Sequence, residues 1–127
     1  MIARPSAGEW IGTYPAEIMV CDADGIILEM NAVSGQIYEQ EGGLAMIGRN
    51  VFDHHLEPAR SQMMNVVKQK RHVLYTTEKD GLKKLISIAP WQRDGEYAGF
   101  ALIVLDLPKK IPNIVKDRVD LSGKTRI

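Results

Sequence analysis

The stretch over residues 22–31 constrains the fold more than any other part of the sequence. It reads DADGIILEMN and joins two apolar runs, residues 18–21 and 26–30, through a turn. Gly25 can adopt the positive φ that a tight hairpin turn requires, and the two aspartates before it are typical turn residues. Asn31 precedes apolar residues spaced as on one face of a helix, and its side chain can accept hydrogen bonds from the first helical turn. The sequence therefore predicts a β-hairpin that leads directly into a helix.

The rest of the chain divides into a helical block and a block of strands. A pair of glycines ends the first helix, which we expect over residues 32–41. Apolar residues recur at helical spacing over residues 59–70, which predicts the longest helix. From His72 onward the pattern is that of strands separated by Asp-Gly turns, and the expected strands are residues 73–77, 82–91 and 97–107. The last of these is the most apolar, so we expect a central strand covered on both faces.

The order of these elements resembles that of a PAS domain over roughly residues 16–107. The resemblance rests on the motifs D-x-D-G-x-I and N-A, a short helix, and then I-G-R-N. It implies an α+β, PAS-like fold with a five-stranded antiparallel sheet and helices packed on one face. Residues 1–15 are then expected to form an N-terminal cap segment, and residues 108–127 a basic C-terminal tail that is either a partly ordered extension or a docking helix.

Charge and cysteine content exclude several classes of function. The 127-residue chain carries 16 basic and 16 acidic residues, so no net field favours binding to nucleic acid or a membrane surface. No apolar run approaches the roughly 20 residues of a membrane-spanning helix. The single cysteine, Cys21, fits a reducing compartment and is expected to be a small buried hydrophobe. We therefore expect a cytoplasmic protein with no nucleic-acid or membrane partner.

The sequence contains no recognisable catalytic constellation. It has neither a nucleophile motif nor a phosphate-binding glycine loop, and the turn explains the pair Asp22 and Asp24. The adjacent histidines His54 and His55 lack the spacing of a metal site, so we interpret them as surface or cap residues. The sequence predicts a protein that is not an enzyme and binds no metal.

The resemblance allows the cofactors of sensory PAS domains to be checked against this chain. Haem-binding PAS sensors take their axial histidine from the long helix, and residues 59–70 contain none. The G-R-N motif resembles that of blue-light flavin sensors, but Val51 stands where they require a cysteine. The chromophore cysteine of photoactive yellow proteins is also missing, since Ala59 follows Pro58. The sequence identifies no cofactor.

The resemblance places a ligand between the sheet and the helices, where apolar and aromatic positions match. These positions are Phe52, Met63, Val67, Tyr75, Ile88, Phe100 and Leu102. The same residues can equally fill a core without a ligand. Tyr75 and Glu29 carry polar groups in otherwise apolar strands, so we expect them either to face water or to orient a ligand.

Two functions are compatible with these observations. The main hypothesis is a non-catalytic sensory or regulatory PAS module in signal transduction, which binds a small-molecule ligand or relays a partner's state. The alternative is a protein–protein interaction and dimerisation domain with a filled core and no ligand. Trp10, Ile11 and Tyr14 lie outside the expected core, and an exposed apolar cluster is often an interface, so we also expect a homodimer.

The residues at the end of the last strand indicate how the domain passes on its signal. Asp106 and Leu107 resemble the first two positions of the junction that leads many PAS sensors into an output helix. Pro108 has no amide to donate and disfavours helical φ/ψ at the preceding residue, so a continuous helix cannot begin there. We expect output through a separate effector protein, unless the chain is a fragment of a longer sensor.

Overall fold

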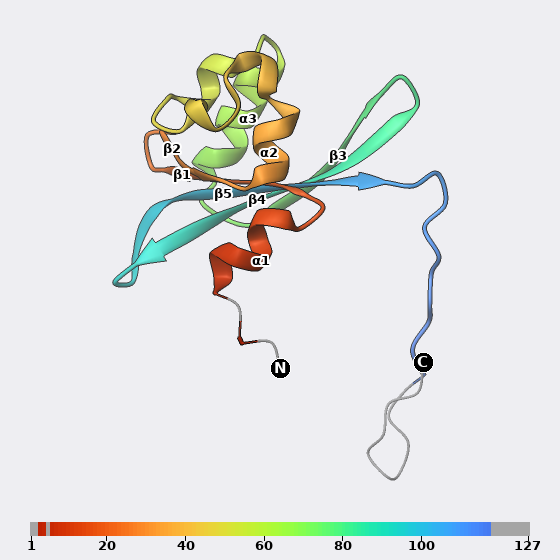
Figure 1. Cartoon of the computed structure of the whole chain (residues 1–127). Helices are drawn as coiled ribbons and strands as arrows, with labels where there is room; N and C mark the ends of the chain where they lie inside the picture. The colour runs from red at the N-terminus through yellow and green to blue at the C-terminus, as the bar shows by residue number, and fades with distance from the viewer. Residues whose placement is uncertain (1–2, 5, 118–127) are drawn as a thin grey trace.

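The computed structural model describes residues 3–4 and 6–117. Its elements, with η denoting 3₁₀ helices, are α1 (Ala7–Thr13), β1 (Glu17–Asp22), β2 (Ile27–Met30), α2 (Ala32–Ile37), η1 (Glu39–Glu41), η2 (Gly43–Met46), η3 (Val51–His54), α3 (Ala59–Lys68), β3 (Val73–Lys79), β4 (Leu82–Arg93) and β5 (Glu96–Leu107). The strands form one antiparallel sheet in the order β2-β1-β5-β4-β3. Figure 1 shows α2 and α3 on one side of the sheet and α1 on the other. The predicted α+β fold is confirmed.

The β1–β2 hairpin forms as the turn residues predict. The side chain of Asp22 accepts hydrogen bonds at 2.9 Å from the amides of Asp24 and Ile26, which fixes the turn. Gly25 has a φ of +89°, and a Cβ there would lie 2.6 Å from the Phe52 ring. Glycine is therefore required both by the backbone conformation and by the close approach of the ring.

The helix after the hairpin is shorter than predicted. Asn31 caps α2 by accepting a hydrogen bond from the Ser34 amide at 3.0 Å, but the α-helix ends at Ile37 instead of residue 41. The chain then tightens into η1 and turns at Gly42, which has a φ of +119°. This early end leaves Tyr38 at the C-cap of α2, with its side chain turned towards β1.

Strand β5 is the central strand, as predicted, but it is not covered on both faces. Phe100, Leu102 and Val104 alternate along its buried face, with at most 8% of each residue exposed. Ile103 points to the opposite face and is 37% exposed. The continuous apolar run therefore reflects a helix-covered face together with an outer face that is only partly covered.

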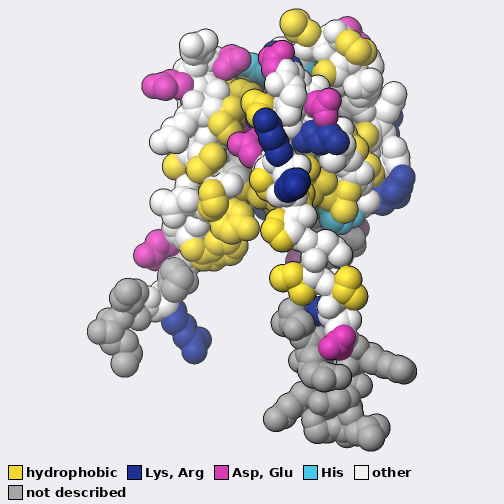
Figure 2. Space-filling model, turned by 90° about the vertical axis from the view of Figure 1, so that its right-hand side faces the viewer, with side chains coloured by type: hydrophobic (Ala, Val, Ile, Leu, Met, Phe, Trp, Pro, Cys, Tyr) yellow, Lys and Arg dark blue, Asp and Glu magenta, His cyan; other side chains and the backbone are white. Residues whose placement is uncertain are grey.

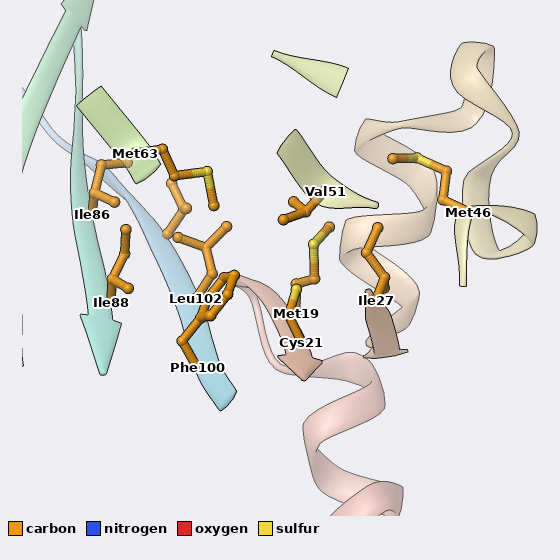
Figure 3. Close-up of a cluster of buried hydrophobic side chains, with 11 residues drawn as sticks. Met19, Cys21, Ile27, Met46, Val51, Met63, Ile86, Ile88, Phe100 and Leu102 are labelled. Carbon is orange, nitrogen blue, oxygen red and sulfur yellow. The ribbon is translucent and has the colours of Figure 1, made fainter. Parts of the chain in front are cut away.

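The hydrophobic core lies between the sheet and the helices, as Figure 3 shows. Cys21 is fully buried in it and is a free thiol, as predicted, and desolvation together with the neighbouring Asp22 raises its pKa to about 12. In Figure 2, basic and acidic side chains lie beside one another on the surface facing the viewer, with hydrophobic side chains between them. No helix within the described part of the chain is long and apolar enough to cross a membrane.

After β5 the chain continues from Pro108 to residue 117 without helix or strand. The predictions for the end of the basic tail, residues 118–127, lie outside the described residues.

Candidate functional site

A cavity of about 230 Å³ lies between α3 and the buried face of the sheet. We call it the ligand cavity. Its apolar lining comes from the start and middle of α3 and from strands β4 and β5: Ala59, Met63, Ile86, Ile88, Leu102 and Val104. Its polar and aromatic lining is Glu17, Tyr38, His55, Gln62, Tyr75, Thr77 and Lys84. An apolar body with a few polar groups is the usual character of a small-molecule site.

Glu17 is the buried polar group of the ligand cavity. It begins β1, is only 5% exposed and pairs with Val104 of β5. Because side chains alternate along a strand, Glu17 points to the same face as Met19 and Cys21. Tyr38, at the C-cap of α2, donates its hydroxyl hydrogen to Oε1 of Glu17 at 2.7 Å. The lining of the cavity thus includes a buried carboxyl group.

Burial shifts the pKa of both members of this pair. Desolvation raises the pKa of Glu17 above its ordinary value of 4.5, while the Tyr38 hydrogen bond and the Lys84 ammonium oppose the rise. Desolvation also raises the pKa of Tyr38, and the adjacent Glu17 carboxylate adds to that shift. The Tyr38 hydroxyl therefore stays protonated at neutral pH.

The adjacent histidines differ in their surroundings. His54 ends η3, and His55 is its C-cap, in agreement with the cap interpretation, but the side chain of His55 also lines the ligand cavity. Nδ1 of His55 lies 3.0 Å from the Val51 carbonyl oxygen. Because a carbonyl can only accept, Nδ1 donates this hydrogen bond. Among the described residues, no group of three or more His, Cys, Asp or Glu side chains is arranged to hold a metal ion.

Four of the seven predicted site residues line the ligand cavity: Met63, Tyr75, Ile88 and Leu102. They come from four different elements, α3, β3, β4 and β5, so the fold brings together positions that are far apart in sequence. Desolvation raises the pKa of the Tyr75 hydroxyl, which is the polar group that this residue brings to the cavity wall.

The other three predicted residues lie elsewhere. Phe52 and Phe100 pack against each other with ring centroids 5.9 Å apart, and Phe100 is 2% exposed. Phe52 and Val67 line a separate groove of about 300 Å³ beside the β1–β2 turn. Glu29 is exposed on β2 and faces water instead of the ligand cavity. Phe52, Val67 and Phe100 therefore fill or flank the core and do not line the ligand cavity.

Sequence reasoning missed Glu17 and Tyr38. A signal for Glu17 existed, because extending the first strand back by one residue places it on the face of Met19 and Cys21. Tyr38 gave no local signal, since its partner lies 21 residues away and the hydrogen bond depends on where α2 ends.

No protein-family model matches the chain, and no curated protein sequence matches it. Solved structures do. The PAS domain of an HTR-like protein from Haloarcula marismortui is 19% identical, with a TM-score of 0.54, 79% of this chain covered and 88% of that chain. A sensory box sensor histidine kinase from Vibrio cholerae is 16% identical, with a TM-score of 0.58 and the same two coverages, 79% and 88%.

A third structure is the Aer2 receptor from Vibrio cholerae, described as a dual PAS-heme oxygen sensor. It is 22% identical with a TM-score of 0.53, and the match covers 73% of this chain and 95% of that chain. These likenesses extend over most of both chains, and they show that this chain has the PAS fold, as its sequence predicts.

Proposed function

We propose that this chain is a non-catalytic sensory module that binds a small molecule in the ligand cavity and relays its occupancy. The observation that carries the proposal is a space of about 230 Å³ between α3 and the sheet, whose lining combines apolar side chains with the buried carboxyl group of Glu17. The PAS fold supports it, because structural neighbours include a sensor histidine kinase and a receptor. The free thiol of Cys21 fits a reducing compartment, so we place this module in the cytoplasm.

Native mass spectrometry of the purified protein tests this proposal. A molecule that accompanies the folded protein and is released on denaturation is the expected result. Val104→Phe should abolish its retention, because the larger side chain enters the cavity that Val104 lines. Ile103→Phe is the matched control, since the neighbouring residue on β5 points to the other face of the sheet. Equal retention by both variants would contradict the proposed location.

Dimerisation is a second candidate function, favoured by an exposed aromatic pair. Trp10 and Tyr14 are 51% and 44% exposed, and their rings meet edge to face with centroids 6.1 Å apart. We propose that this pair forms part of a homodimer interface. Trp10→Ala should raise the dimer dissociation constant at least tenfold in sedimentation equilibrium. Leu56→Ala, at an 87% exposed position, is the control and should have no effect. A monomeric wild type at high micromolar concentration would refute the interface.

We further propose that output passes to a separate effector protein. The described residues after β5 support this, because Pro108 follows the strand and no helix occurs among residues 108–117. Quantitative affinity capture with the full chain and with a version ending at Leu107 provides the test. Loss of the same captured protein on truncation is expected, and equal capture by both versions would contradict a role of the tail.

A further inference from the structure

The carboxyl group of Glu17 has a single hydrogen-bond donor among the described residues. Oε1 accepts the hydrogen bond from Tyr38, and within residues 3–4 and 6–117 no group donates to Oε2 and no cation forms an ion pair with Glu17. A buried carboxylate without a counter-ion is costly, and the cost falls when a cation is supplied.

The free oxygen of Glu17 opens onto accessible space. No buried side-chain nitrogen or oxygen of the described residues lacks a hydrogen-bond partner, so an unpartnered Oε2 cannot be a sealed atom. Glu17 lines two spaces, the 230 Å³ ligand cavity and a neighbouring space of about 40 Å³. The smaller has room for about one water molecule, whose share of the liquid is ~30 Å³. A larger partner for Glu17 must therefore occupy the ligand cavity.

A further acceptor lines the same cavity. The Tyr38 oxygen donates its hydrogen to Glu17 and keeps lone pairs that can accept. With Oε2 of Glu17, the cavity lining presents acceptors from β1 and from the end of α2.

The charged groups around Glu17 leave room for one more cation. Lys84 lines the cavity, but its ammonium lies 3.7 Å from Asp106 on the neighbouring strand, and its side chain is 42% exposed. Lys84 and His55 lower the pKa of Glu17 and Asp106 raises it, but desolvation is the largest cause and leaves the pKa raised. The charge of Glu17 is thus only partly compensated by the groups around it.

We propose that the ligand cavity binds a small primary amine in its protonated form. An ammonium group has three N–H donors, and the carboxylate of Glu17 and the hydroxyl oxygen of Tyr38 can accept from it. A short hydrocarbon body then packs against Met63, Ile88 and Leu102. The cavity volume of about 230 Å³ suits a compact molecule. This inference rests on the proposed function and names the chemical class of its ligand.

Three probes of the same size and shape separate the head-group chemistry from general binding. They are 3-methylbutylamine, 3-methylbutanol and 3-methylbutanoate, titrated into the full chain at pH 7 and followed by protein-observed NMR. Because charge-assisted hydrogen bonds are stronger than neutral ones, we expect the amine to bind at least tenfold more tightly than the alcohol, and the acid most weakly.

Variants identify the residue that causes the preference. Glu17→Gln should weaken amine binding about tenfold and alcohol binding much less, because it removes the charge and keeps the shape. Glu29→Gln is the matched control, since it removes an exposed carboxylate from the same hairpin. If Glu17→Gln does not fold, Tyr38→Phe replaces it and should weaken amine binding several-fold.

The outcomes distinguish this inference from the proposed function. Equal affinities of amine and alcohol, or an amine preference that survives in the folded variant, would overturn the amine assignment while leaving small-molecule binding intact. Failure of all three probes to shift any cavity resonance would overturn the amine assignment, and the proposed function would fail as well only if native mass spectrometry also found no retained molecule.

Discussion

The two halves of the core differ in how completely they are filled. In the filled half, the buried side chains of β1, β2, η2 and η3 are at most 2% exposed: Met19, Cys21, Ile27, Met46 and Val51. In the open half, side chains of α3, β4 and β5 border the ligand cavity: Met63, Ile86, Ile88, Leu102 and Val104. Figure 3 shows the labelled members of both groups on the same face of the sheet. The layer between the helices and the sheet is thus close-packed on one side and holds the ligand cavity on the other.

The buried polar groups of the two halves differ in how many hydrogen bonds they make. Asn31 accepts hydrogen bonds from the amides of Ile18 and Ser34 and donates to the Ala16 and Ile11 carbonyls. Glu17 receives one hydrogen bond. A saturated polar group holds the structure together, whereas a buried polar group that borders free space can bind another molecule.

Removing the saturated group should have the largest effect. Asn31→Ala removes five side-chain hydrogen bonds to backbone groups and uncaps α2. We expect a loss of about 3 kcal/mol in the free energy of unfolding, measured by urea denaturation. Asn50→Ala is the control, since Asn50 caps η3 with one bond and donates one more, and it should cost about 1 kcal/mol. Similar losses of unfolding free energy in both variants would contradict the special structural role of the saturated polar group.

The same Val→Leu substitution in each half compares the packing of the two halves directly. Val51 belongs to the filled half and is 2% exposed, so Val51→Leu should cost about 1–3 kcal/mol through overpacking. Val104 borders the ligand cavity, so Val104→Leu should change the free energy of unfolding by less than about 1 kcal/mol. Chemical denaturation of both variants measures the difference, and an equal cost would show that the cavity does not accept the added methylene.

The pH dependence of stability should show the raised pKa of Glu17. The folded-state pKa lies above the ordinary 4.5, so the stability that Glu17 contributes is complete below pH 4.5 and is lost as the pH rises through the raised value. The groups acting on this carboxyl are Tyr38, Lys84, His55 and Asp106. Glu17→Gln should remove this decline, and Glu29→Gln should retain it. An unchanged pH profile in Glu17→Gln would contradict the assignment.

The smallest effect is expected at Cys21, in the filled half. Its pKa of about 12 keeps the thiol protonated, and its side chain is fully buried. Iodoacetamide at pH 8 should modify the native protein negligibly and the urea-denatured protein completely, as measured by intact mass. Rapid labelling under native conditions would show that the filled half opens readily.

Much of the fold was accessible from the sequence because its signals are local. The turn around Gly25, the cap at Asn31 and the strand patterns after His72 each depend on a few consecutive residues. The end of the first helix was less accessible, because Tyr38 leaves the helix to reach Glu17 on β1. Long-range pairing decided that boundary, and residue patterns within the helix do not encode it.

Only part of the candidate site could be predicted from the sequence. Strand alternation identifies which side chains of β4 and β5 face inwards, such as Ile88 and Leu102, but it does not say where the interior is filled. Phe100 faces inwards too, yet it packs against Phe52 instead of bordering the cavity. The difference depends on how helices and loops pack above the sheet, which is a property of the whole fold.

Methyl NMR under xenon pressure tests the contrast between the two halves most directly. Xenon enters accessible apolar cavities without requiring a particular head group. We expect shifts at the methyl groups of Met63, Ile86, Leu102 and Val104, and none at Ile27 or Val51. Absence of shifts in the open half, or equal shifts in both halves, would contradict the claim that this domain keeps a binding cavity beside a filled core.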